Sequence, residues 1–246
     1  MSLSTSIAHL KQHLRKLPGY RYACAIPDLF KDKESRNAAL LRMFRPRGLY
    51  QPFGTTSEDR YPEIFALVRD HVGDGPDVRI LSFGCATGEE VFSLRRYFPL
   101  GTIQGIDISP RNIAVCRRRL AMADDKQMFF SVAGSTAGEP DATYDAIFAM
   151  AVFRHGDLNV SPPPARCEAY IRFVDFEQSV TDLARVLKPG GLLVIQHAMF
   201  RFSDTRAASA FDTLLNAGPD ENWPVYSSDN HLLPGPEDTG VVFQKR

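Results

Sequence analysis

The chain has little of what marks several common classes of protein. Its 246 residues include four cysteines, Cys24, Cys85, Cys116 and Cys167, and no two of them form a C-x-x-C pair. Scattered single cysteines give neither a disulfide framework nor zinc-ligand spacing, so we expect no metal site and a reducing, cytoplasmic location. No apolar run approaches the ~20 residues that a membrane-spanning helix needs, and no internal repeat is present.

The chain also lacks an excess of charge of either sign. Lys plus Arg and Asp plus Glu number 29 each, so the formal net charge is zero. Proteins that bind nucleic acids or anionic membranes commonly carry a basic excess. We therefore expect neither nucleic acid nor a membrane as a partner. The sequence does not indicate an oligomeric state.

Residues 1–75 show helical and irregular patterns, broken by prolines and glycines, and no strand pattern. A first helix is expected near residues 7–17, whose apolar side chains share one face. No acid precedes Asp28, as in a transit peptide, but the apolar face favours an ordinary packed helix. We predict that residues 1–75 form a helical lid over a site on a second unit, residues 76–246.

From residue 78 onward, apolar runs alternate with helical patterns, which is typical of a parallel sheet covered by helices on both faces. The fold class predicted is α/β, with a Rossmann-like sheet of seven strands that is mostly parallel and has an antiparallel last strand. The strands are expected at 78–83, 102–107, 128–133, 144–150 and 192–197, with weaker ones at 225–227 and 241–244. The helices are expected at 88–97, 109–122, 173–187 and 204–217.

A glycine-rich turn follows the first of these strands. Gly84 and Gly88 bracket the turn, which leads straight into a helix. Glycines at such a turn allow a ligand to touch bare backbone. Asp107 closes the second strand, at roughly the spacing of an acid that accepts hydrogen bonds from ribose hydroxyls. This order of features predicts a nucleoside site at the carboxyl edge of the sheet.

The loop lacks the middle glycine of the dinucleotide pattern G-x-G-x-x-G, because Ala86 occupies that position beside Cys85. S-adenosylmethionine contains an adenosine and an amino-acid tail but no phosphate. The N-terminus of the helix that begins near Gly88 suits its carboxylate. We therefore favour S-adenosylmethionine as the cofactor, and keep NAD as a distant alternative.

Four segments together resemble class I S-adenosylmethionine-dependent methyltransferases, whose sheet also has seven strands. They are I-L-S-F-G-C-A-T-G-E-E at 80–90, G-I-D-I-S at 105–109, Y-D-A-I-F at 144–148 and L-K-P-G-G at 187–191. The T-G-E-E ending is similar to the CheR-type chemotaxis receptor methyltransferases. Those enzymes carry an N-x-T-x-x-x-R segment ahead of the core, and residues 54–60 keep its Thr and Arg but have Gly54 in place of the Asn.

The resemblance implies contacts with each part of the cofactor. It places Thr56 and Arg60 near the amino-acid tail and the methyl group, Glu89 at the methionyl amino group, and Gly134-Ser135 at the adenine edge. Glu90 is expected to be a solvated first-turn acid. The family's Asn-Val after the fourth strand is Ala151-Val152 here, which removes a polar contact. The complete set of expected cofactor contacts is Thr56, Arg60, Gly84, Cys85, Ala86, Gly88, Glu89, Asp107, Ile108, Gly134, Ser135, Ala151 and Val152.

Three residues are candidates for work on the methyl acceptor. Arg60 could orient a carboxylate, and His155 or His197 could take a proton from a hydroxyl or an amine. The alternative for each histidine is a loop residue without a catalytic role. We expect methyl transfer to O or N of a small-molecule acceptor, because no segment looks like the β-rich subdomain that docks CheR-type enzymes on receptors. A protein carboxyl methyltransferase and a non-catalytic S-adenosylmethionine-binding module are the alternatives.

Overall fold

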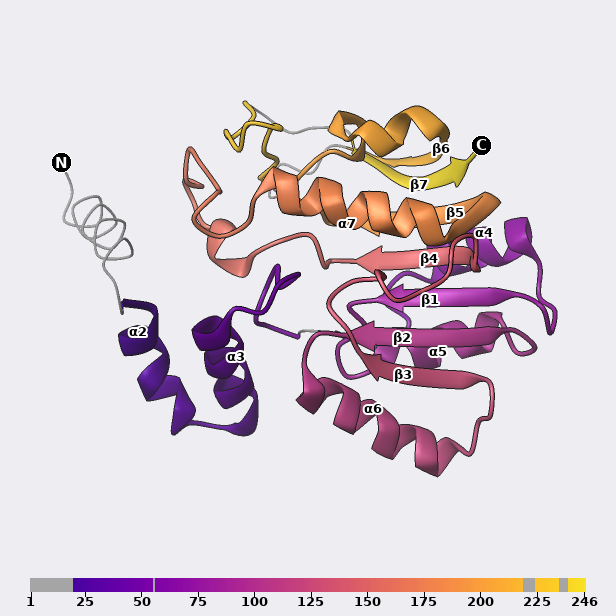
Figure 1. Cartoon of the computed structure of the whole chain (residues 1–246), viewed down its shortest axis with the longest axis horizontal. Coiled ribbons are helices and arrows are strands. Elements are labelled where there is room, and N and C mark those ends of the chain that lie inside the picture. The colour runs from indigo at the N-terminus through magenta and orange to yellow at the C-terminus, as the bar shows by residue number, and fades with distance from the viewer. Residues whose placement is uncertain (1–19, 55, 219–223, 235–238) are drawn as a thin grey trace.

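The computed structural model describes residues 20–54, 56–218, 224–234 and 239–246 (Figure 1). The helix expected near residues 7–17 lies outside these residues. The strands of the sheet are β1 (Arg79–Phe83), β2 (Thr102–Asp107), β3 (Met128–Val132), β4 (Tyr144–Met150), β5 (Leu187–Gln196), β6 (Phe211–Ala217) and β7 (Thr239–Lys245). The helices are α2 (Tyr20–Leu29), α3 (Lys33–Phe44), α4 (Pro62–Val72), α5 (Glu89–Tyr97), α6 (Pro110–Ala123) and α7 (Phe173–Val186).

The seven strands form one sheet in the order β3-β2-β1-β4-β5-β7-β6. Strands β1 to β5 run parallel to their neighbours in this group. Strand β7 is antiparallel to both β5 and β6. The order reverses at β1, where the chain passes from β1–β3 on one side to β4 and β5 on the other. This topology confirms the predicted Rossmann-like fold class.

Each face of the sheet has its own apolar core, because successive residues of a strand point to opposite faces. Ile80 packs with residues of α4, α5 and α6, including Phe65 and Leu94. Leu81, its neighbour in β1, packs on the other face with residues of α7 such as Phe176. The strands are therefore buried on both sides, as their continuous apolar runs predicted.

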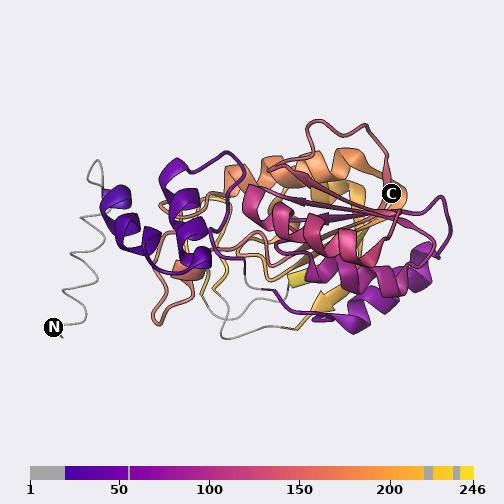
Figure 2. The same ribbon diagram turned by 90° about the horizontal axis from the view of Figure 1, so that it is seen from below.

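The carboxyl ends of β1 to β4 point toward the N-terminal helices. In Figure 1 the arrowheads of these strands face α3, and Figure 2 shows α2 and α3 at one end of the molecule with the sheet at the other. Ligands of open α/β sheets bind beyond the carboxyl ends of the strands, where the strand order reverses. No described helix is both long enough and apolar enough to cross a bilayer.

Two predicted elements near the C-terminus are wrong. The expected helix at 204–217 is instead two 3₁₀ turns, Phe202–Asp204 and Arg206–Ala210, followed by strand β6. The expected strand at 225–227 is only a pair of bridges, from Tyr226 to Phe200 and to Leu232. Pairing with β7, which is distant in the sequence, overrides the local preference of the β6 segment.

Gly105 in β2 tests the packing between the sheet and α5. A β-carbon at Gly105 would lie 2.8 Å from Cδ1 of Phe130 and 2.9 Å from Cγ2 of Val91. We expect Gly105→Ala to lower the free energy of unfolding by about 1–3 kcal/mol through overpacking. Gly75→Ala is the matched control, because a β-carbon there meets nothing within 4 Å. Urea unfolding curves check both variants, and an unchanged midpoint for Gly105→Ala would contradict the packing described.

Candidate functional site

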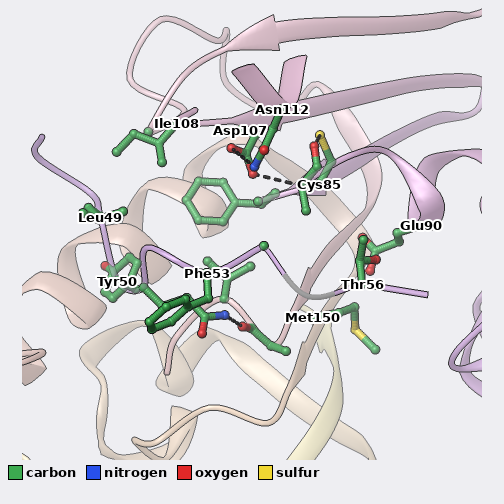
Figure 3. Close-up of a pocket in the computed structure, with 18 of the residues that line it drawn as sticks. Leu49, Tyr50, Phe53, Thr56, Cys85, Glu90, Asp107, Ile108, Asn112 and Met150 are labelled. Atoms are coloured by element: carbon green, nitrogen blue, oxygen red, sulfur yellow. Dashed lines mark hydrogen bonds between the residues drawn. The ribbon is translucent and has the colours of Figure 1, made fainter. Parts of the chain in front are cut away.

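A pocket lies at the carboxyl ends of β1, β2 and β4, beneath residues 48–54 and 56–61, which lie between α3 and α4 in the sequence (Figure 3). Its walls and open mouth enclose about 960 Å³ of space. In Figure 3, Asp107, Asn112 and Cys85 form one wall, whereas Leu49, Tyr50 and Phe53 lie on the opposite side. The pocket therefore has one wall from the sheet and one from the N-terminal part of the chain.

Four N–H groups of the glycine loop between β1 and α5 donate to acceptors within the protein. Gly84 N and Cys85 N both donate to Ile106 O, at 2.8 and 2.9 Å, and Gly88 N donates to Cys85 O. Ala86 N donates to Oδ2 of Asp107 at 2.9 Å. None of these four donors remains for a diphosphate, which dinucleotide-binding loops hold with backbone N–H groups.

The shape of this loop depends on the absence of a side chain at Gly84. Its φ is +76°, and a β-carbon there would lie 2.5 Å from Cγ2 of Val152. Ala86, with φ of 47°, adopts the left-handed conformation that glycine accepts without strain. The loop therefore approaches the end of β4 closely and presents backbone to the pocket.

Asp107 joins the loop to the start of α6. Its Oδ1 accepts from Ser109 N at 2.8 Å and from Nδ2 of Asn112 at 3.1 Å, in addition to the bond from Ala86 N to Oδ2. The residue is only 8% exposed, and burial raises the pKa of its carboxyl against the effect of these donors. A carboxylate offers about four acceptor positions, so it retains capacity for a ribose hydroxyl in the pocket.

Of the two neighbouring acids of α5, Glu90 lies at the pocket and Glu89 does not, which is the reverse of what was expected. Glu90 lines the pocket, and its Oε1 accepts a 2.7 Å bond from Oγ of the buried Ser82. Glu89 is not among the pocket's lining residues; it pairs with Nη1 of Arg119 at 2.7 Å and accepts from Oγ1 of Thr87. The expectation that Glu90 is a solvated acid is wrong, and the proposed contact of Glu89 with the methionyl amino group stays a prediction that this placement does not favour.

Burial sets the ionisation of Glu90. It raises the pKa of Glu90 to about 7, although the bond from Ser82 and the positive charge of Arg60 act in the opposite direction. A carboxyl with a pKa near neutrality exchanges its proton readily at physiological pH. Glu90 is thus a functional candidate that its position in a first helical turn did not reveal.

A side chain from the N-terminal segment reaches the end of β4. Nε2 of Gln51 donates to Ala151 O at 2.8 Å. Ala151 has a φ of 57° and lines the pocket together with Val152. The polar group that Ala151 lacks is therefore replaced in this region by an amide from a residue 100 positions earlier in the chain.

The same segment packs against the loop after β3. A β-carbon at Gly48 would lie 2.3 Å from Gly134 O, and one at Gly134 would lie 2.9 Å from Arg47 O. Gly134 and Ile108 line the pocket, whereas Ser135 is exposed and does not. Backbone approaches backbone here without an intervening side chain, so the segment covers the edge at which adenine is expected.

Ten of the thirteen expected cofactor contacts line the pocket, and Gly88, Glu89 and Ser135 do not. The ten are Thr56, Arg60, Gly84, Cys85, Ala86, Asp107, Ile108, Gly134, Ala151 and Val152. Their roles in binding remain predictions. Asn112 and Gln51 were missed; a polar residue three positions after the Ser109 helix cap was a signal for Asn112, and Gln51 had none.

Only one of the three candidate catalytic residues lines the pocket, although Arg60 and His197 both lie against the Tyr61 ring. Arg60 lines the pocket, with its guanidinium 5.2 Å from the centre of the Tyr61 ring. His155 caps a 3₁₀ turn by accepting from Asp157 N, and its ring lies beside Tyr170. His197 follows β5 with a φ of 54°, and its ring centre is 5.8 Å from that of Tyr61. Neither histidine lines the pocket, so the structure does not favour them as bases.

Comparison with known proteins identifies the part of the chain that builds this pocket. Residues 81–195, somewhat less than half of the chain, match the family model described as "Methyltransferase domain". This segment is similar to a methyltransferase domain. The family uses S-adenosylmethionine, and a loop in which the N–H groups of Gly84, Cys85, Ala86 and Gly88 are bonded within the protein fits that molecule better than a diphosphate. In the part of the chain that the structure describes, no cluster of His, Cys, Asp or Glu could hold a metal ion.

Two curated relatives share this domain. The chain is 27% identical over 117 residues to a demethylmenaquinone methyltransferase of Thermus thermophilus. The aligned region covers 48% of this chain and 46% of that protein. It is 30% identical over 124 residues to a fatty-acid O-methyltransferase of Mycolicibacterium smegmatis, covering 50% and 38%. The chain thus spans less than half the length of either relative. The similarity to chemotaxis receptor methyltransferases finds no support in these relatives.

Solved structures resemble the chain at a lower level. The [4+2]-cyclase SpnF has a TM-score of 0.46 at 22% identity, and the aligned region covers 72% of this chain and 64% of the SpnF chain. A geranyl diphosphate C-methyltransferase from Streptomyces coelicolor has a TM-score of 0.40 at 19% identity and covers 55% and 45%. Similarities of this size say nothing about the acceptor.

Glu90 predicts a specific dependence of stability on pH. Because its folded-state pKa of about 7 exceeds the ordinary glutamate value of 4.5, its contribution to stability is full below about pH 4.5 and is lost as the pH rises through about 7. We expect Glu90→Gln, which cannot ionise, to be more stable than the wild type at pH 8 by up to about 3 kcal/mol. This advantage shrinks toward pH 4.5.

Urea unfolding at several pH values measures this difference. Glu89→Gln is the matched control, because it removes a neighbouring carboxylate that lies outside the pocket. If the wild type and Glu90→Gln showed the same pH dependence, a buried, titrating Glu90 would be ruled out.

Proposed function

We propose that this protein transfers a methyl group from S-adenosylmethionine to an oxygen or nitrogen of a small, largely apolar acceptor. The observation that carries the proposal is the composition of the pocket. Its sheet-side wall offers the Asp107 carboxylate and a glycine loop whose N–H groups are satisfied. Its other wall carries apolar side chains, such as those of Phe53 and Tyr61, beside polar ones such as Ser57 and Arg60. The sheet-side wall would suit an adenosine, which residues 48–54 would cover, and the apolar side chains near Tyr61 and Met150 would suit the acceptor.

Each part of the cofactor has a complement in the pocket. Asp107 would accept from the ribose hydroxyls, and Ile108 and Gly134 would border the adenine. Glu90, with Thr56 near it in Figure 3, would face the methionyl amino group. When bound, S-adenosylmethionine supplies a methyl group on a positively charged sulfur. The residues then have to align the acceptor with that methyl and keep water away.

The acceptor side of the pocket is aromatic. Phe53, Tyr61, Phe65 and Met150 line it, and apolar walls exclude water and bind apolar groups without directional bonds. The names of the two curated relatives, a demethylmenaquinone and a fatty-acid O-methyltransferase, likewise point to apolar acceptors. Arg60, which also lines the pocket, would orient an acceptor carboxylate, an acceptor that is already ionised and requires no base.

A protein carboxyl methyltransferase is the second candidate, supported by the presence of both Thr56 and Arg60 in the pocket. A side chain presented by another protein would have to reach the cofactor past the segment 48–54, which runs over the pocket. A small acceptor meets no such obstacle. A binding module without turnover is the third candidate. Methyl transfer to small molecules but not to proteins in a cell extract would decide among the three.

The cofactor assignment is tested by calorimetric titration of S-adenosylhomocysteine and NAD. We expect S-adenosylhomocysteine to bind the wild type and NAD not to bind. Asp107→Asn should bind at least tenfold more weakly, since loss of a charged hydrogen-bond acceptor costs about 1.5–3 kcal/mol. Asp125→Asn, a change in an acid on the loop before β3, should bind like the wild type. Absence of S-adenosylhomocysteine binding would remove both the cofactor and the proposed activity.

The neighbouring acids of α5 provide a matched pair for the amino-acid end of the cofactor. We expect Glu90→Gln to weaken S-adenosylhomocysteine binding by about tenfold or more, because it removes the charge that faces the ammonium group. Glu89→Gln should change the affinity by less than about threefold, because its partner is Arg119. The same calorimetric titration measures both, and the reverse order would restore the assignment of this role to Glu89.

A further inference from the structure

The helices α2 and α3 pack together in an unusual way. The residues buried between and beneath them are small, namely Ala25, Ala38 and Ala39. Their large apolar side chains face solvent: Phe30 is 82% exposed and Phe44 is 77% exposed. An ordinary globular helix places its large apolar residues inside and its polar residues outside. This hairpin buries alanines and leaves two phenylalanines exposed, whereas Leu29, Leu41 and Met43 are half-buried.

The exposed apolar residues follow helical stripes. Ile26 and Phe30 are four residues apart, at the end of α2 and in the turn after it, and both are exposed. Leu40 and Phe44 are four residues apart on α3 and also exposed. Residues at this spacing share a helix face, so each helix presents a continuous apolar strip. Contiguous exposed apolar surface of this kind marks an interaction site.

The charge of this region shows what kind of partner fits. Residues 1–48 contain ten Lys and Arg and three Asp and Glu, whereas the remaining residues contain 19 and 26. The zero net charge of the whole chain therefore conceals a basic N-terminal part and an acidic remainder. Lys33, Arg36, Arg45 and Arg47 are exposed, and none forms an ion pair with a carboxylate of the described residues.

We propose that the α2–α3 hairpin docks on an anionic lipid surface. Basic side chains around exposed phenylalanines are the composition of helices that lie in the membrane interface, where the rings enter the lipid and the cations meet the headgroups. A second copy of the chain is a poorer occupant, because symmetric contact would bring two basic surfaces together. The proposal concerns a surface and does not depend on the proposed reaction.

The hairpin lies next to the pocket, so docking it on lipid would affect access to the site. A second cavity lies between the hairpin and the methyltransferase domain, with Asp28, Ala38 and Arg42 on the hairpin side. It shares Pro52, Phe53, Gly54, Thr56 and Asn112 with the pocket. Docking of the hairpin would thus bring this cavity, and the pocket that it adjoins, close to the lipid surface.

Sedimentation of the full chain with vesicles tests the proposal. We expect binding to vesicles of phosphatidylcholine and phosphatidylglycerol that weakens with added salt, and weaker binding to phosphatidylcholine alone. The double variant Phe30→Ser, Phe44→Ser should bind roughly tenfold more weakly for each ring removed. Met122→Ser, which changes an 89% exposed residue on α6, is the matched control and should bind like the wild type.

Charge reversal provides an independent arm. Lys33→Glu should weaken binding to the anionic vesicles at least fivefold, whereas Arg118→Glu, on exposed α6, should have little effect. All four variants should retain circular dichroism and affinity for S-adenosylhomocysteine, so a failure of vesicle binding leaves the proposed function untouched.

Three results would overturn the proposal. The first is a lack of binding to anionic vesicles by the wild type. The second is sedimentation as a dimer that the phenylalanine variant abolishes, which would assign the surface to a second copy. The third is retention on immobilised polyglutamate without vesicle binding, which would assign it to an acidic protein.

Discussion

The carboxylate of Asp107 ties together the parts of the chain on which the pocket depends. Through its two oxygens it connects the turn after β1, at Ala86, with the turn after β2, at Ser109 and Asn112. Burial of a carboxylate is unfavourable unless donors replace the lost water, and here three donors do so. The bond from Ala86 also holds the glycine loop in its left-handed turn. The two turns that border the ligand site are therefore held together by this one group.

The carboxylate of Glu90, unlike that of Asp107, has few hydrogen-bond donors in the unliganded protein. It accepts one hydrogen bond, from Ser82, and burial holds its pKa near 7. An uncharged side chain would be better accommodated in the unliganded protein. A carboxylate that is poorly satisfied in the empty pocket becomes well satisfied when a cationic group enters. Strain of this kind is typical of functional sites, where a group is arranged for its ligand and not for the fold.

The features that were predictable from the sequence are local ones. The buried strands before Gly84 and Asp107 are short apolar runs, and the turn between strand and helix is marked by its glycines. Features set by distant contacts were not predictable. Strand β6 forms because β7 pairs with it, and Gln51 meets Ala151 across 100 positions. Glu89 and Glu90 differ by about 100° around a helix, and only the packing of Val91 and Leu94 against the sheet decides which of them faces the pocket.

The bond between Gln51 and Ala151 and the close contact between Gly48 and Gly134 have a consequence for how the pocket is assembled. Together they fasten the segment 48–54 across the cofactor side of the pocket at two points, one at the end of β4 and one after β3. Residues 48–54 lie outside the segment 81–195 that matches the family model. The part of the chain that is similar to a methyltransferase domain therefore does not build the whole pocket, and a fragment restricted to it would lack one wall.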